Sequence, residues 1–184
     1  MPTYEIIIAG FGGQGVMFLG EILAHAALHE GYEVTWLPSY GPEQRGGTAH
    51  CTVVISDRPV ASPVVADPSI LIALNRPSLD RFEPAVRPGG LIVCDVTMTG
   101  RAPARPDAET VCVPATAIAN DLGAARVANM VILGALLAAQ PILSQDSIRA
   151  ALETKVRDPQ ARARNLDALA RGAQEVASHV QRAS

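Results

Sequence analysis

Cysteines and aromatic residues are the scarce components of this sequence. Aromatic side chains make up 4% of its 184 residues, so the hydrophobic core must be built from Ala, Val, Ile and Leu. The three cysteines, Cys51, Cys94 and Cys112, are far apart and lie inside apolar runs, with no CxxC pair among them. That pattern is typical of buried, reduced thiols in a cytoplasmic protein. It argues against a zinc site or an iron–sulfur cluster carried by this chain alone.

A strong charge of either sign and a membrane-spanning segment are also missing. The net charge is −3 and the pI is about 5.8, which gives no electrostatic basis for binding nucleic acid. The longest apolar stretch, Val127 to Ala139, contains Asn129 and is too short to span a bilayer. A secretory signal requires a basic segment before its apolar run, and no such segment precedes the first apolar run here. We therefore expect a cytoplasmic protein with neither a nucleic-acid nor a membrane partner.

The first forty residues predict a βαβ unit. A β-branched run from Tyr4 to Ala9 suits a strand that is buried on both faces. A glycine-rich turn, a helix from Gln14 to about Glu30 that stops at Gly31, and a strand from Glu33 to Leu37 follow it. This order of elements implies a parallel pair formed by the two strands.

The remainder of the chain completes one α/β domain over residues 1–184. An antiparallel pair is expected from His50 to Ile55 and from Val60 to Val65, because Asp-Arg-Pro at 57–59 favours a tight reversal. Further buried strands are predicted at 69–74, 91–94 and 110–113, and helices at 77–86, 115–122, 126–140, 144–155 and from 158 onward. The predicted fold is a three-layer α/β/α domain with a mostly parallel, mixed sheet.

The glycine-rich turn is the first candidate binding segment. Its glycines let the backbone approach a ligand, and the following helix offers unpaired N–H groups to an anion. They are Gly10, Gly12, Gly13 and Gly15. The spacing matches the dinucleotide fingerprint, which also needs an acidic residue at the end of the second strand. Glu33 lies at the start of that strand, which is the wrong end and weighs against nucleotide binding. Nucleotide binding and a purely structural turn stay open as alternatives.

The second candidate is the segment SYGPEQRGG at residues 39–47. It follows the second strand, so we expect it near the glycine turn, at the carboxyl edge of the sheet where ligands bind. Its glycines, Gly41, Gly46 and Gly47, permit positive φ, while the proline restricts the residue before it. A loop fixed in this way can present Tyr40, Glu43 and Arg45 in set directions, and Arg45 could grip a phosphate or carboxylate. The alternative is a weak surface ion pair between Glu43 and Arg45.

Asn129 is the one polar residue inside an otherwise apolar predicted helix. A buried amide without hydrogen-bond partners costs roughly 1–3 kcal/mol, so we expect its side chain to bond a backbone loop in a structural role. His25 and His29 have the i, i+4 spacing of metal ligands, but no third ligand with suitable spacing follows them. A solvated helix face explains the two histidines better, and we predict no metal site.

Together these segments resemble one known family. GFGGQG (10–15), SYGPEQRGG (39–47), SDRPVASP (56–63), ALNRP (73–77), PGG (88–90) and RVANMVILGALL (126–137) occur in the order seen in the gamma subunit of 2-oxoacid:ferredoxin oxidoreductases. Within that family the sequence looks closer to the 2-oxoglutarate-type or general 2-oxoacid enzymes. One departure is the pair Ala124-Ala125, where the family often has an asparagine after the glycine.

The resemblance implies an enzyme that is shared among several chains. The family oxidatively decarboxylates a 2-oxoacid on thiamine diphosphate with Mg, transfers the acyl group to coenzyme A, and passes electrons through iron–sulfur clusters to ferredoxin. This sequence has neither the Gly-Asp-Gly motif of thiamine-diphosphate sites nor cluster cysteines. Alpha and beta subunits, and a ferredoxin-like delta chain where one exists, are expected to hold these cofactors.

The role that the resemblance leaves for this chain is assembly and closure of the active site. The two glycine-containing loops would face the partner subunits, with Gln14, Tyr40, Glu43 and Arg45 touching a partner, the substrate or coenzyme A, and none of them catalytic. The small subunit of indolepyruvate:ferredoxin oxidoreductase fits the same motifs. A free-standing nucleotide-binding module that uses Gly10 to Gly15 is the alternative from another functional class.

Overall fold

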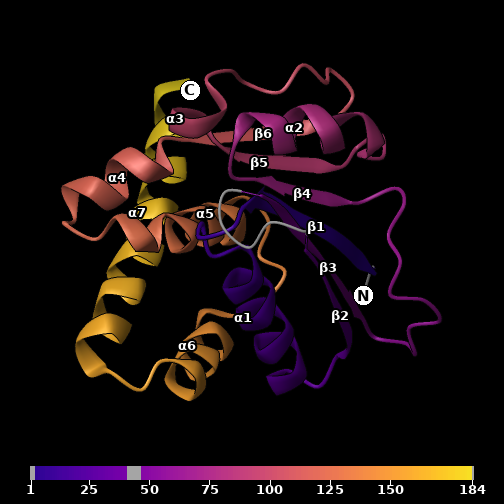
Figure 1. Ribbon diagram of the computed structural model, residues 1–184, viewed down its shortest axis with the longest axis horizontal. Helices are drawn as coiled ribbons and strands as arrows, with labels where there is room; N and C mark the ends of the chain where they lie inside the picture. Colours follow the sequence, from indigo (N-terminus) through magenta and orange to yellow (C-terminus); the bar gives the residue numbers. More distant parts are fainter. Residues whose placement is uncertain (1–2, 41–46, 184) are drawn as a thin grey trace.

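The computed structural model describes residues 3–40 and 47–183, which form a six-stranded sheet flanked by helices (Figure 1). The strands lie in the order β2-β3-β1-β4-β5-β6. Their bounds are β1 Tyr4–Phe11, β2 Glu33–Tyr40, β3 Thr48–Ser56, β4 Ile70–Ala73, β5 Leu91–Asp95 and β6 Glu109–Val113. β1, β4, β5 and β6 form three parallel pairs, whereas β3 is antiparallel to both of its neighbours. The predicted mixed, mostly parallel sheet is confirmed.

Helices cover the two faces of the sheet unequally. Because side chains alternate along a strand, Ile6 and Ile8 of β1 enter one core while Ile7 and Ala9 enter the other. The larger core packs against α1 Val16–His29, α4 Ala115–Asp121, α5 Ala128–Ala139, α6 Gln145–Lys155 and α7 Pro159–Ala183. The smaller core packs under α2 Arg76–Phe82 and the 3₁₀ turn Glu83–Ala85, with the short helix α3 Val96–Thr99 beside α2 (Figure 1). The three-layer α/β/α prediction is therefore also confirmed.

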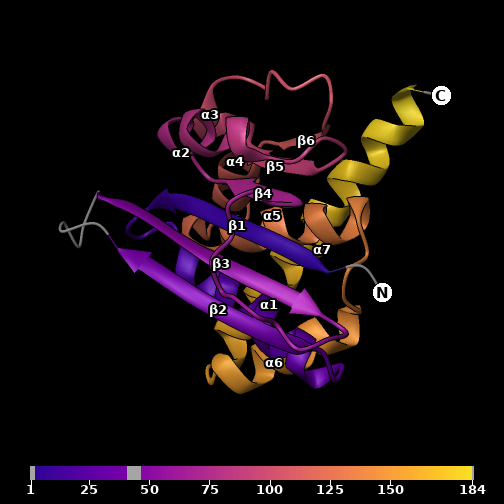
Figure 2. The same cartoon turned by 90° about the vertical axis from the view of Figure 1, so that its right-hand side faces the viewer.

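The pairing expected for the opening βαβ unit is wrong in one respect. β1 and β2 run in the same direction, but β3 is inserted between them, with Phe11 opposite Thr48 and Tyr40 opposite Ala49 (Figure 2). Burial explains the order, because β3 is almost wholly buried and suits the interior of the sheet. β2 contains Pro38, whose missing N–H is tolerated on an edge strand.

The strand predicted from Val60 to Val65 is absent, because residues 57–69 form no strand. Two prolines, Pro59 and Pro63, remove N–H groups that a sheet ladder would need. The Thr52 hydroxyl of β3 instead donates a hydrogen bond to the Pro63 carbonyl at 2.9 Å. Val65 is buried in the smaller core and Val60 packs against it, so these two residues serve loop packing rather than strand pairing.

The predicted helix boundaries agree with the observed ones to within a few residues. Gly15 (φ 76°) precedes α1 and Gly31 (φ 82°) follows it, both in the left-handed region that favours glycine. The Ser144 hydroxyl accepts a hydrogen bond from the Ser147 N–H and caps α6. Pro159 opens α7, as predicted. The short helix α3 was not predicted. No helix in the described part of the chain is long and apolar enough to cross a membrane.

Glu30 links the end of α1 to the start of α6, and the stability that its carboxylate adds to the fold depends on pH. Its carboxylate accepts hydrogen bonds from the Ser144 N–H and the Ser147 hydroxyl, both at 2.6 Å. Burial acts to raise the pKa of Glu30, but the hydrogen bonds from Ser147 and Ser144 outweigh it, and the pKa is lowered. A lowered folded-state pKa stabilises the fold above the unfolded-state value, about 4.3, and this contribution is lost as the pH falls through the folded-state pKa.

We therefore expect Glu30→Gln to lower the free energy of unfolding at neutral pH, by less than about 1 kcal/mol because the carboxylate is exposed. The difference from wild type should shrink as the pH is lowered from neutral to an acidic value below the folded-state pKa of Glu30. Urea unfolding at the two pH values measures it, with Glu33→Gln on the exposed start of β2 as the control. An equal loss of stability at both pH values would contradict the assignment.

Candidate functional site

A crevice lies at the carboxyl ends of β1 and β4, where the connections that follow the two strands run to opposite faces of the sheet. β1 leads into α1 on the larger-core face, and β4 leads into α2 on the opposite face. Such a switch point leaves a gap between neighbouring connections, where ligands of open α/β sheets bind. The crevice has a volume of about 290 Å³ and is lined by Gly13, Gln14, Leu74, Asp95, Met98, Thr116, Ala125, Arg126, Ala128 and Asn129.

The Gln14 side chain holds the glycine turn in shape. Its Oε1 accepts hydrogen bonds from the Phe11 N–H at 2.7 Å and from Asn75 Nδ2 at 2.8 Å. Its Nε2 donates to the Leu74 carbonyl at 2.9 Å, so one amide joins the turn after β1 to the end of β4. A Cβ atom on Gly10 would lie 2.8 Å from Gln14 Oε1, so glycine is required there for this side chain to fold inward. Gln14 therefore shapes one wall of the crevice.

Asn129 fixes the start of α1 from the opposite side. Its Nδ2 donates to the Gly15 carbonyl at 3.2 Å, and its Oδ1 accepts from the Met130 N–H at 2.9 Å. The predicted contact from this buried amide to a backbone loop is confirmed. A Cβ atom on Gly15 would overlap the Asn129 amide, and Gly15 also has positive φ, so two independent constraints require glycine at this position.

Asp95 organises the wall that β5 supplies. Although it is only 2% exposed, its carboxylate accepts three hydrogen bonds: from the Thr97 N–H at 3.1 Å, the Thr116 N–H at 3.1 Å and the Thr116 hydroxyl at 2.5 Å. These bonds cap α3 and the first turn of α4 with one side chain. The loops that follow β5 and β6 are thereby tied together next to the crevice.

The two predicted loops meet where the structure describes them. The Gly12 N–H donates a hydrogen bond to the Gly47 carbonyl at 3.0 Å, which confirms that the glycine turn and the end of the second loop are neighbours. Tyr40, at the end of β2, is 69% exposed and therefore accessible to a partner. Gly41, Glu43, Arg45 and Gly46 lie outside the described residues.

Positive charge lies at the mouth of the crevice. Arg126 is exposed and lines both the crevice and an adjoining hollow of about 450 Å³, which Arg164 of α7 also lines. The shared wall contains Ala125 and Asn129. The guanidinium group of Arg126, which shares the crevice with Gly13, can attract a phosphate or carboxylate group.

The geometry of the glycine turn disfavours a dinucleotide site. In that kind of site the second strand is next to the first, so that its terminal acid reaches the ribose. Here β3 separates β1 from β2. The N–H groups of Gly12 and Gln14 already donate within the protein, to the carbonyls of Gly47 and Phe11. A pyrophosphate would have to displace these bonds.

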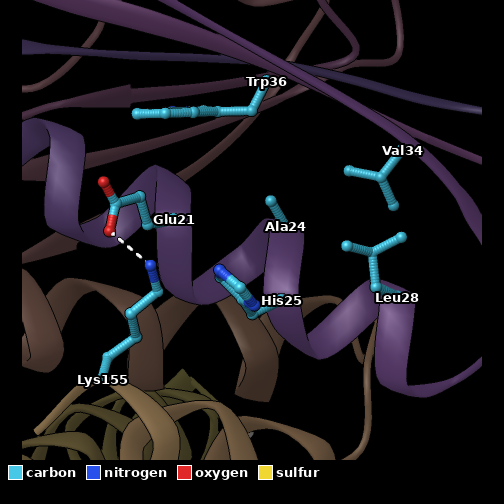
Figure 3. Close-up of a pocket in the computed structure, with 7 residues that line it drawn as sticks. All are labelled: Glu21, Ala24, His25, Leu28, Val34, Trp36 and Lys155. Atoms are coloured by element: carbon cyan, nitrogen blue, oxygen red, sulfur yellow. Dashed lines mark ion pairs between the residues drawn. The ribbon is translucent and has the colours of Figure 1, made fainter.

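A second hollow of about 240 Å³ lies between α1 and the edge strand β2 (Figure 3). Trp36 and Val34 of β2 form one side of it, and Leu28 of α1 contributes an apolar side chain to the other. Glu21 and Lys155 form an ion pair there, with 3.1 Å between Oε2 and Nζ. His25 lines this hollow, but across residues 3–40 and 47–183 no three His, Cys, Asp or Glu side chains gather as metal ligands would.

Sequence reasoning missed Asn75, Asp95 and Thr116 as site residues. Asn75 is 1% exposed, caps α2 by accepting from the Ser78 N–H at 2.9 Å, and donates to Gln14. The sequence contains a recognisable pattern for two of these three residues. Asn75 and Asp95 each follow a buried strand and precede helical spacing, a pattern typical of N-cap residues at the carboxyl edge of a sheet.

The comparison with protein families decides where the chain belongs. The family model described as pyruvate ferredoxin/flavodoxin oxidoreductase matches residues 5–175, a range that includes both loops and every residue of the crevice. The chain belongs to this family. The resemblance inferred from the order of the sequence motifs is thereby confirmed.

Named members of the oxidoreductase family show the domain in two settings. Subunit KorC of 2-oxoglutarate synthase from Methanocaldococcus jannaschii is 38% identical over 152 residues, which cover 80% of this chain and 81% of KorC. Ketoisovalerate oxidoreductase subunit VorA from Methanothermobacter thermautotrophicus is 46% identical over 153 residues, 83% of this chain but 32% of VorA. The chain thus spans about a third of VorA and most of KorC.

A solved structure from the same family has the same fold. The gamma subunit of a keto/oxoacid ferredoxin oxidoreductase from Geobacter sulfurreducens superposes with a TM-score of 0.80 at 30% sequence identity. The match covers 95% of this chain and 99% of that subunit. The fold described above is therefore that of an oxidoreductase gamma subunit.

Proposed function

We propose that this chain is the gamma-type subunit of a multi-subunit, thiamine-diphosphate-dependent 2-oxoacid:ferredoxin oxidoreductase, and that its carboxyl-edge crevice closes an active site carried by partner subunits. This role is supported by the hydrogen bonding of the polar side chains in the crevice. Gln14, Asp95 and Asn129 are all hydrogen-bonded within the protein. They give the edge a fixed shape and leave the reacting groups to other chains.

The lengths of the relatives support a function divided among chains. In VorA the homologous segment is part of a chain about three times as long, whereas KorC is little longer than the matched region. The same domain therefore occurs both fused to further protein and as a small chain. We propose that alpha and beta subunits supply the remainder here, and that they and any delta chain hold thiamine diphosphate, Mg and the iron–sulfur clusters.

The surface that faces the partners consists of the glycine turn, Tyr40 with the loop that follows it, and the positive mouth of the crevice. Gly13 has φ 103° and open space around it, so it brings bare backbone to the surface. Arg126 is placed to meet an anionic group, which in this enzyme is a coenzyme A phosphate or a partner carboxylate. The substrate is a 2-oxoacid, and the motifs of this chain favour a 2-oxoglutarate-type or general 2-oxoacid enzyme.

Co-expression with the alpha and beta chains encoded beside its gene tests the proposal. We expect the three chains to co-elute on size-exclusion chromatography and to catalyse coenzyme-A-dependent reduction of a viologen dye. Omission of this chain should abolish turnover. 2-Oxoglutarate, pyruvate, ketoisovalerate and indolepyruvate, assayed separately, identify the substrate and distinguish the indolepyruvate alternative. A chain that stays monomeric and adds nothing to turnover would sink the proposal, and nucleotide titration would then test the alternative.

Arg126→Ala tests the crevice within that complex. Loss of a charge-assisted hydrogen bond costs about 1.5–3 kcal/mol, so kcat/KM for coenzyme A, or the stability of the complex, should fall roughly tenfold or more. Arg149→Ala is the matched control and should leave both unchanged, because Arg149 is exposed on α6 and lines neither the crevice nor the adjoining hollow. A change in KM alone identifies coenzyme A as the anion, and dissociation identifies a partner carboxylate. Wild-type behaviour of Arg126→Ala would rule out this role.

A further inference from the structure

Two cysteines from different parts of the sequence meet on neighbouring strands. Cys94 of β5 and Cys112 of β6 are in register, and their Sγ atoms are 3.6 Å apart. In-register residues of adjacent strands have Cα atoms about 4.8 Å apart, within the range of about 4.4–6.8 Å that disulfides require. A disulfide has its sulfurs about 2.05 Å apart, so each sulfur would have to move by only about 0.8 Å. The in-register pairing therefore meets the Cα separation that a disulfide requires.

The two thiols differ in access and in hydrogen bonding. Cys94 is completely buried, whereas Cys112 is half-buried on β6, one of the two edge strands of the sheet. The Cys94 Sγ–H donates a hydrogen bond toward Cys112 Sγ. The same bond, together with burial, raises the pKa of Cys94 and keeps that thiol protonated. A partly exposed cysteine beside a buried one is the arrangement of an attacking and a resolving cysteine.

The third cysteine, Cys51, is fully buried, and its thiol bonds a backbone carbonyl rather than a second thiol. Cys51 lies in the interior strand β3 on the larger-core face, and its thiol donates to the Val16 carbonyl at 3.6 Å. Burial raises its pKa to about 12. Cys51 is therefore an internal control for thiol chemistry in this chain.

We propose that Cys94 and Cys112 form a reversible disulfide when the protein meets a hydroperoxide. The Cys112 thiolate attacks the peroxide, the O–O bond breaks, and Cys112 becomes a sulfenic acid with release of hydroxide or alkoxide. Cys94 then attacks that sulfur, its proton leaves with the hydroxyl as water, and the S–S bond forms. Two electrons pass from the two sulfurs to the peroxide, and a dithiol reductant returns both thiols.

The position of this bond gives it a structural consequence. Asp95 directly follows Cys94, and its partner Thr116 lies four residues beyond Cys112. The disulfide therefore clamps β5 to β6 immediately below the crevice wall that Asp95 organises. This inference does not depend on the proposed oxidoreductase role, because it rests only on the two thiols.

Peptide mapping of the full-length chain tests the proposal. The reduced protein is treated with hydrogen peroxide, quenched with N-ethylmaleimide under denaturing conditions and digested without reductant. We expect a cross-linked peptide pair containing Cys94 and Cys112, lighter than the two free peptides by two hydrogen atoms, with Cys51 recovered as the maleimide adduct. Dithiothreitol should restore all three thiols.

Three variants define the chemistry. Cys51→Ser should form the same cross-link, and Cys112→Ser should form none. In Cys94→Ser the sulfenic acid on Cys112 should persist and be trapped by dimedone, whereas wild type should give little trapped product. Oxidation of wild-type Cys112 to sulfinic or sulfonic acid without a cross-link would overturn the proposal. Unreacted thiols at peroxide levels that oxidise a model thiol would overturn it as well.

Discussion

Replacing Gly134 by alanine is expected to destabilise the folded chain by about 3 kcal/mol or more, which is a large fraction of a typical total of about 5–15 kcal/mol. Gly134 of α5 and Gly172 of α7 lie where the two helix backbones touch. A Cβ atom on Gly134 would overlap the Leu169 carbonyl, and one on Gly172 would overlap the Val131 carbonyl. Backbone atoms cannot change rotamer, so relief requires moving α7 away from the core.

Urea unfolding measures the effect, and Gln174→Ala is the matched control. Gln174 lies on the exposed side of α7, so its replacement by a good helix former should change stability by less than about 0.5 kcal/mol. Gly172→Ala should reproduce the loss seen with Gly134→Ala, because it breaks the same contact from the other helix. If both glycine variants were as stable as wild type, the close approach of α5 and α7 would be wrong.

Asp95→Ala is expected to cost about 3 kcal/mol and to loosen the crevice wall. Removal of the carboxylate leaves the N–H groups of Thr97 and Thr116 and the Thr116 hydroxyl without their acceptor in a partly buried site. The first turns of α3 and α4 should then open more often, so their amides should exchange with solvent faster than in wild type. Urea unfolding and hydrogen exchange at residues 96–99 and 115–118 are the measurements.

A double-mutant cycle separates this network from a general loss of stability. Thr116→Val removes one donor, and its effect should not add to that of Asp95→Ala, because the two residues share a hydrogen bond. Asp67→Ala, in the exposed loop before β4, is the control for loss of one acidic charge. Strict additivity between Asp95→Ala and Thr116→Val would show that the carboxylate does not hold α4.

The sequence by itself determined most local features of this protein. Continuous apolar runs identified β1, β4 and β5 because buried parallel strands carry apolar side chains on both faces. Gly31, Ser144 and Pro159 marked helix ends because each solves a local problem of backbone conformation or capping. The motifs at 10–15 and 39–47 indicated the family, and the buried amide of Asn129 required a partner, which proved to be the Gly15 carbonyl.

Only the tertiary structure decided which strands are neighbours and which side chains form the crevice. The insertion of β3 between β1 and β2 depends on the relative burial of whole strands, which no local pattern records. Val60 and Val65 were assigned to a strand because apolar residues that pack a loop look the same in sequence as those that pair. The hydrogen bonds of Gln14 to Leu74 and Asn75, about sixty residues away in the sequence, could not be read from the local pattern. Long-range contacts of this kind arise only when the sheet assembles, and they brought Asp95 to Thr116 and Cys94 to Cys112.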